Sequence, residues 1–176
     1  IEGAIGQITQ IADELIRIDP AYAGQYENNA TRYITALREL EEETTGFMQS
    51  DGVKKAVSVH DAFHYLTEDF GIEVIETITE GSYENASAKQ IQSLIEHMKS
   101  EKVSVILTEQ KNKDLAILNT IQNEVDCKVY VLDALVTGDE RMAYEDSLNC
   151  EEMTYEYVVR MEENMRILRE VFARKV

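Results

Sequence analysis

Side chains that can bind metal ions or carry protons come at the ends of the short apolar segments of this sequence. Four such residues stand at or just beyond the end of an apolar segment: His60, Asp61, Glu109 and Asp133. A neutral imidazole together with carboxylates is a ligand set that suits Zn²⁺, Mn²⁺ or Fe²⁺. The same groups can also serve as general acids and bases. The residue types therefore offer two kinds of chemistry, a divalent-metal site and a proton-transfer site.

Each of the four residues also has a structural explanation without function. His60 and Asp61 precede a predicted helix, and the first turn of a helix favours a side-chain acceptor and negative charge. Glu109 and Asp133 are explained equally well as solvated residues at strand ends. The sequence leaves the functional and the structural explanations open.

The remaining histidines and the cysteines add little to this choice. His64 lies four residues after His60, a spacing that can place two imidazoles on one helix face, but HxxxH with no third ligand is a weak signal. We therefore expect surface positions for His64 and for His97, which lies in a predicted helix far from the strand ends. Cys127 and Cys150 form no CxxC, and the sequence does not decide whether they pair.

Composition and motifs argue against several classes of function. The net charge is −17, from 34 acidic and 17 basic residues, and phosphate binding needs clustered Lys and Arg, so we expect no nucleic-acid partner. The charge is compatible with a cationic ligand or a basic partner, and equally with a solvated acidic surface. The sequence contains no GxGxxG, GxxxxGK[ST] or GxSxG, so nucleotide binding and hydrolase chemistry lack their usual motifs.

The elements that must position the candidate residues follow from hydrophobic periodicity. Two helices are predicted first, at 1–18 and 20–48, with Asp19 and Pro20 as the N-cap and first residue of the second helix. Strands and helices then alternate. The predicted strands are 54–59, 72–78, 103–109 and 127–135. The predicted helices are 61–70, closed by Gly71; 87–102, opened by a capping box of Ser87 and Gln90; 115–125; and a final helix with Val158, Met161, Met165, Leu168 and Phe172 on one face.

This alternation of strands and helices requires right-handed crossovers and gives a parallel sheet with helices on both faces. The predicted fold class is α/β, a three-layer sandwich with a four-stranded parallel sheet, preceded by a long helix. Ligands of open parallel sheets collect beyond the carboxyl ends of the strands. We therefore expect His60, Glu109 and Asp133 to gather at one edge of the sheet.

Four segments, taken in order, resemble the C-terminal half of the metal-binding solute-binding proteins of bacterial zinc, manganese and iron ABC importers, a group that includes adhesin-type lipoproteins. The segments are DPAYAGQYENNATRYITALRELEEE, VSVHDAFHYLTEDFGIEV, ILTEQ, and VYVLDAL followed by a helix containing YEYVVRMEENMRIL. The resemblance covers nearly the whole chain. It implies an extracytoplasmic receptor of two α/β lobes with the metal between them, in which residues 1–52 form an N-terminal helix and the long inter-lobe helix, and residues 53–176 the C-terminal metal-binding lobe.

The resemblance also implies roles for individual residues. His60 matches the third metal ligand, Asp133 is the best match for the fourth, and Glu109 matches a position that supports the ligands without binding the metal. It implies a binding protein and not an enzyme, with an ABC importer permease as partner. Membrane attachment is expected only through an anchor outside this chain.

The sequence departs from the family pattern because the N-terminal lobe and its two histidines are absent. Two ligands leave a tetrahedral cation half-coordinated, so we expect a fragment that binds zinc or manganese weakly or not at all without its missing lobe. Two alternatives remain. One is a small α/β enzyme that uses His60, Asp61 and Glu109 as acid–base groups, and the other is a ligand-free interaction domain.

Overall fold

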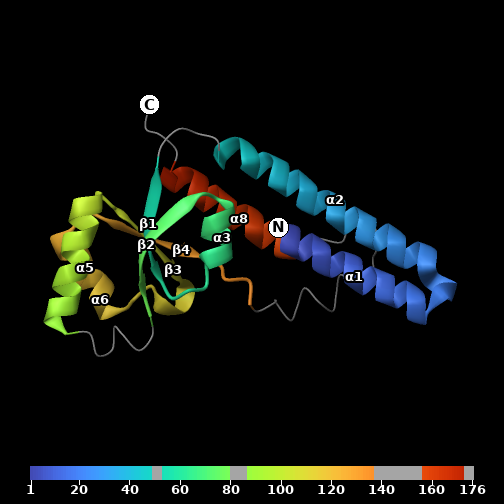
Figure 1. Ribbon diagram of the computed structural model, residues 1–176, viewed down its shortest axis with the longest axis horizontal. Helices are drawn as coiled ribbons and strands as arrows, with labels where there is room; N and C mark the ends of the chain where they lie inside the picture. Colours follow the sequence, from blue (N-terminus) through green and yellow to red (C-terminus); the bar gives the residue numbers. More distant parts are fainter. Residues whose placement is uncertain (49–52, 80–86, 137–155, 173–176) are drawn as a thin grey trace. The chain divides into compact units, whose positions relative to one another are not determined.

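The computed structural model describes residues 1–48, 53–79, 87–136 and 156–172 (Figure 1). The chain forms two compact units. One unit comprises Ile1–Gln49 and Thr137–Glu162, and the other comprises Ser50–Val136 and Glu163–Val176. The N-terminal helices therefore belong to the first unit, and the whole sheet belongs to the second.

Two helices joined by a 3₁₀ turn make up the N-terminal part of the first unit. They are α1 (Glu2–Ile18), η1 (Pro20–Tyr22) and α2 (Ala23–Met48). Helix α1 packs along α2, with Ile5 of α1 and Leu37 of α2 among the buried side chains. Arg38 on α2 also forms an ion pair with Glu2 at the start of α1. The predicted helix at 1–18 is thus confirmed.

Asp19 is at the predicted N-cap position before Pro20, but it is not a side-chain cap of an α-helix. The Asp19 side chain caps no backbone N–H, and Pro20 opens η1 rather than an α-helix. The Asp19 carboxylate instead accepts a hydrogen bond of 3.1 Å from the Tyr26 hydroxyl. The partner of the Asp19 carboxylate is therefore in the first turn of α2, and α2 itself begins only at Ala23.

A four-stranded, all-parallel sheet forms the centre of the second unit. Its strands are β1 (Lys54–Val59), β2 (Ile72–Ile78), β3 (Val105–Glu109) and β4 (Lys128–Leu132), in the order β2-β1-β3-β4. The ladders between neighbouring strands are parallel throughout. The predicted α/β class with a four-stranded parallel sheet is confirmed. Strand β4 ends three residues before its predicted end at 135, because the main chain of Asp133 pairs with a side chain instead of a strand.

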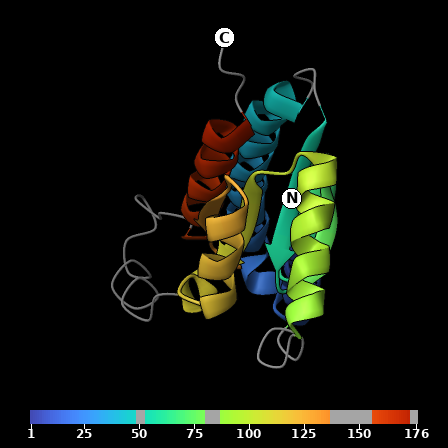
Figure 2. The same cartoon turned by 90° about the vertical axis from the view of Figure 1, so that its left-hand side faces the viewer.

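Helices cover both faces of the sheet. They are α3 (His64–Asp69), α5 (Ala88–Glu101), α6 (Ala116–Glu124) and α8 (Glu156–Phe172). Helices α5 and α6 lie side by side on one face (Figure 2), where Ile95, Met98 and Leu118 pack with Val57 and Ile106 of the strands. Helix α3 and the part of α8 from residue 163 onward lie on the opposite face. The result is the three-layer arrangement expected for right-handed crossovers.

Local signals at two helix ends are also confirmed. Ser87 and Gln90 form both hydrogen bonds of the capping box at the start of α5. Gly71 adopts a φ of 58° after α3, the left-handed conformation that glycine takes at little cost. Each signal therefore fixes where an element begins or ends.

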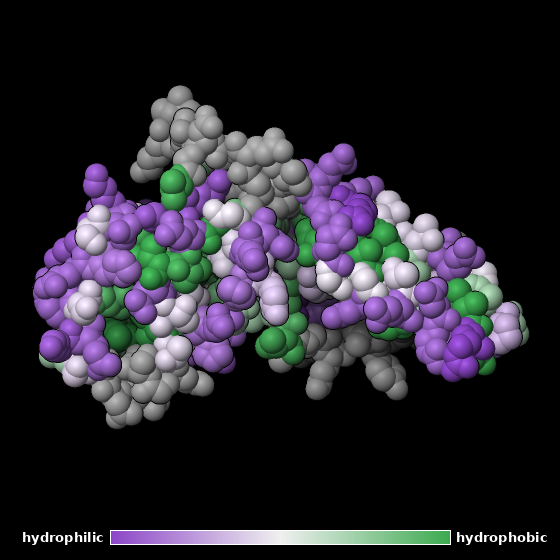
Figure 3. Space-filling model, viewed as in Figure 1, coloured by the Kyte–Doolittle hydropathy of each residue, from purple (hydrophilic) through white to green (hydrophobic). Residues whose placement is uncertain are grey.

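The surface is rich in polar side chains, in keeping with the net charge of −17. In the face shown in Figure 3, hydrophilic residues surround smaller hydrophobic patches. None of the helices in the described parts of the chain combines the length and the apolar character needed to cross a bilayer.

Candidate metal centre

The strand-end residues share one edge of the sheet because the four strands are parallel. Ser58 of β1 is in register with Leu107 of β3, and Glu109 of β3 is in register with Leu132 of β4. His60 and Asp133 therefore come at the level of Glu109, on the two strands that flank β3. Neighbouring strands are about 4.8 Å apart, so the main chains of β1 and β4 are separated by about 10 Å.

This edge contains the topological switch point of the sheet. The chain leaves β1 for β2 on one side and returns to β3 on the other side of β1. In open α/β sheets, the crevice that opens at such a reversal is the usual place for a ligand. His60 and Glu109 stand on the two strands that border it.

His60 follows β1 in an unusual backbone conformation. Its φ is 67°, in the left-handed region, which costs a residue with a side chain about 1–2 kcal/mol. Two hydrogen bonds hold it there. Its N–H donates to the Ile78 carbonyl at 2.8 Å, and its carbonyl accepts from the Ser58 hydroxyl at 2.7 Å. Ser58 is only 4% exposed, and Nδ1 of the imidazole is buried, so the histidine is fixed rather than loosely displayed.

The helix-cap explanation for His60 and Asp61 is wrong. Helix α3 begins at His64, its N-cap residue is Phe63, and no side chain caps it. The observed helix therefore starts three residues after the predicted start at residue 61, because the left-handed His60 turns the chain before a helix can form. Asp61 is exposed in this turn.

Glu109 ends β3 as a nearly buried carboxylate. It is 9% exposed, and its Oε2 lies 3.3 Å from Lys111 Nζ and accepts a hydrogen bond of 3.4 Å from the Asn112 amide. Burying a carboxylate is costly unless such partners are present. Glu109 is therefore not a solvated strand end, and its engagement with Lys111 suits a supporting role better than direct metal binding.

Asp133 follows β4 and is held by contacts to its main chain and its side chain. Its N–H donates to Asn164 Oδ1 at 2.7 Å, and its carbonyl accepts from Asn164 Nδ2 at 2.8 Å. The Asp133 carboxylate accepts from the Leu135 N–H at 2.8 Å through Oδ1. Leu135 itself has a left-handed φ of 58°. Asp133 is thus as firmly placed as His60.

Sequence reasoning missed Ser58 and Asn164, the two buried side chains that form hydrogen bonds with the main chains of His60 and Asp133. For Asn164 a signal was present. It lies three residues after Met161 and four before Leu168, so the helical period puts an amide on the apolar face of α8. A buried amide of this kind needs a hydrogen-bond partner, and the sequence did not name one.

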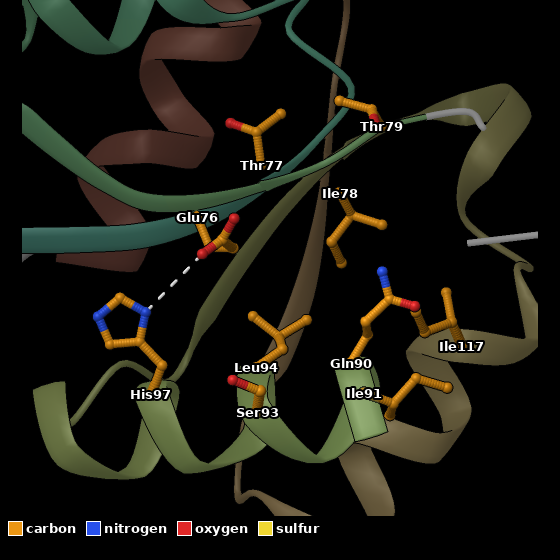
Figure 4. Close-up of a pocket in the computed structure, with 10 residues that line it drawn as sticks. All are labelled: Glu76, Thr77, Ile78, Thr79, Gln90, Ile91, Ser93, Leu94, His97 and Ile117. Atoms are coloured by element: carbon orange, nitrogen blue, oxygen red, sulfur yellow. Dashed lines mark ion pairs between the residues drawn. The ribbon is translucent and has the colours of Figure 1, made fainter. Parts of the chain in front are cut away.

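The other histidines lie outside this edge, as predicted. His64 is exposed on α3, with its Nε2 4.0 Å from Glu68. His97 is exposed on α5, with its Nδ1 3.9 Å from Glu76 of β2. Figure 4 shows His97 and Glu76 at a cavity of about 480 Å³ between β2 and α5, with Leu94 among the apolar lining residues.

The cysteines and the acid–base alternative gain no support from this geometry. Cys127 is buried, and burial raises the pKa of its thiol. Cys150 lies outside the described residues, and so does the question of whether Cys127 and Cys150 form a disulfide. An acid–base site would need His60, Asp61 and Glu109 to act together, but Asp61 is exposed and Glu109 is engaged by Lys111. Over the described ranges, no group of three or more His, Cys, Asp or Glu residues is close enough to hold a metal.

The fold that presents this edge is that of the solute-binding proteins, a class to which the structural neighbour FpvC belongs. The particular family follows from the sequence. Residues 1–171 match the family described as zinc-uptake complex component A, periplasmic, and the chain belongs to that family.

Relatives and solved structures agree with this assignment. The zinc-binding lipoprotein AdcA of Streptococcus pneumoniae is 29% identical over 167 residues, which is 95% of this chain and 32% of that protein. The crystal structure of the Zn(II)-bound ZnuA-like domain of AdcA has a TM-score of 0.74 at 29% identity, covering 97% of this chain and 61% of that one. The solute-binding protein FpvC of Pseudomonas aeruginosa in complex with Mn²⁺ has a TM-score of 0.72 at 27% identity, covering 96% and 59%. The chain thus spans about a third of the curated relative's length.

Proposed function

We propose that this chain supplies the C-terminal half of the metal site in a solute-binding receptor, which delivers a divalent transition-metal ion such as zinc or manganese to an ABC importer. The observation that carries the proposal is the presence of His60 and Asp133 at one edge of the sheet, in a family defined by zinc uptake. Residues 53–176 are then the metal-binding lobe, and residues 1–52 contain the helix that connects it to a second lobe.

Burial at His60 and a hydrogen bond at Asp133 guide the choice of ligand atoms. Nδ1 of the His60 ring is buried, so Nε2 is the nitrogen we assign to the metal. At Asp133, Oδ1 accepts a hydrogen bond from the Leu135 N–H, and Oδ2 is the oxygen we assign to the metal. Glu109 keeps Lys111 at this edge without binding the ion itself. One nitrogen and one oxygen fill half of a tetrahedral site.

The second half of the site is proposed to come from an N-terminal lobe of the same protein. The solved relatives are longer than this chain, which covers 61% of the AdcA domain and 59% of FpvC. With two ligands alone, the cation keeps water at its other positions, so binding to these 176 residues is expected to be weak. The receptor would work outside the cytoplasm, hand its ion to the importer permease, and meet the membrane only through an anchor outside this chain.

A zinc titration followed by NMR of the three histidine imidazoles tests the proposal. The His60 ring should shift first and saturably, while the exposed His97 ring provides an internal control. His60→Ala and Asp133→Ala should each weaken zinc binding while the fold survives. If all three rings shift together without saturation, or if both variants bind zinc like the parent chain, these residues form no metal site.

A further inference from the structure

Asn164 makes an unusual pair of hydrogen bonds for a buried side chain. It is 1% exposed on α8, and it uses both ends of its amide on one residue, Asp133, which lies 31 positions earlier in the chain. Its Oδ1 accepts from the Asp133 N–H, and its Nδ2 donates to the Asp133 carbonyl. A neighbouring strand would bind the same two main-chain groups. The amide therefore continues the pairing of β4 by one residue beyond Leu132, where the ladder to β3 ends.

This pairing determines where the Asp133 carboxylate can point. With the N–H and the carbonyl both fixed, the main chain of Asp133 has one orientation. The Leu135 N–H then holds Oδ1 at 2.8 Å, a charge-assisted bond of the stronger kind. The direction of the second carboxylate oxygen, Oδ2, is set as a result. Both of these hydrogen bonds from Asn164 go to the main chain of Asp133, so they act on the carboxylate indirectly.

We infer that Asn164 is a positioning residue for the metal ligand Asp133, so that it sets the affinity for the ion without touching it. The inference rests on the proposed function, because it assumes that Asp133 binds the ion. Side chains that orient metal ligands typically change metal affinity by about 10- to 100-fold when they are replaced. We expect a loss in this range when the Asn164 amide is removed.

The test compares three new variants of the 176-residue chain with the Asp133→Ala variant described above. Asn164→Leu removes both hydrogen bonds while it keeps the side chain close to its original size. Met165→Leu is the matched control, since Met165 is also 1% exposed on α8 and is not a partner of Asp133. Leu168→Ala lowers stability through a cavity in the same helix, and it separates general destabilisation from an effect on the ligand. Circular dichroism gives the folded fraction of each variant before zinc is added.

The readout follows two ligands separately during a zinc titration. Carbon NMR records the carboxyl signal of Asp133, and the imidazole signals record His60. Loss of positioning should weaken zinc binding by about 10-fold or more in Asn164→Leu. It should also reduce the zinc-induced shift of Asp133 more than that of His60. A purely structural role would reduce both shifts in proportion, as in Leu168→Ala. In Asn164→Leu, the Asp133 amide should exchange its hydrogen faster relative to the other amides of β4, whereas in Leu168→Ala the amides should be affected together.

The outcomes separate this inference from the proposed function. If Asn164→Leu binds zinc like Met165→Leu at equal folded fraction, while Asp133→Ala binds more weakly, the metal site stands and the role of Asn164 is refuted. A proportional loss of both shifts in Asn164→Leu refutes it as well. If Asp133→Ala itself binds zinc like the parent chain, the proposed function fails at Asp133, and the inference fails with it.

Discussion

Replacing His60 by glycine is expected to stabilise the fold relative to the alanine variant, although both changes remove the imidazole. His60 has a φ of 67°, and the left-handed conformation costs a residue with a Cβ about 1–2 kcal/mol. Glycine avoids that cost but loses more backbone freedom on folding, by about 0.5–1 kcal/mol relative to alanine. The midpoints of the two ranges leave His60→Gly more stable than His60→Ala by about 0.7 kcal/mol, and the ranges together span about 0–1.5 kcal/mol.

Urea unfolding of the two variants, followed by circular dichroism, measures this difference directly. The comparison isolates the backbone, because the hydrogen bonds at the His60 N–H and carbonyl are available to both variants. For a chain of this length, a change of 1 kcal/mol corresponds to about 2–4 °C in Tm, so thermal melting should rank the pair in the same order. An alanine variant as stable as the glycine variant, or more stable, would refute the argument that His60 is held under backbone strain.

Two other changes test the local structure. Ser87→Ala removes the capping box of α5 and should lower the free energy of unfolding by about 1 kcal/mol in urea melts, with Ser93→Ala on the exposed side of the same helix as control. Burial raises the pKa of the Cys127 thiol, so this thiol stays protonated in the folded chain. In a Cys150→Ser variant, Cys127 should therefore react with a thiol reagent far more slowly at about pH 8 in the folded chain than in the urea-unfolded chain. Equal rates in the folded and unfolded chains would contradict that account.

The sequence predicted the fold best where local signals mark the ends of an element. Strands β1 and β2 occupy their predicted ranges, and α5 begins at its capping box. The errors come from contacts between distant residues. Helix α3 starts late because the left-handed His60 is held by the Ile78 carbonyl, 18 residues away, and periodicity carries no information about such a contact.

The candidate site was predicted by topology rather than by side-chain detail. Parallel strands alone put His60, Glu109 and Asp133 at one edge, and this required only the order of strands and helices. The residues that fix this edge could not be deduced in the same way. Asn164 pairs with Asp133 across 31 residues, and nothing in the spacing of the two residues relates them. Their roles as ligand and positioning residue stay predictions until metal binding is measured.

The ladder between β1 and β3 is the shortest in the sheet. Its registered partners are Val57 with Ile106 and Ser58 with Leu107. The β1–β2 ladder includes every residue of β1, with one register shift between Ala56 and Val57, and the β3–β4 ladder includes every residue of both strands. The sheet therefore consists of two ribbons with longer ladders, β2–β1 and β3–β4, joined by a short seam. An ion bound by both His60 and Asp133 would bridge this seam from one ribbon to the other. The transported ion would then also hold the two ribbons together.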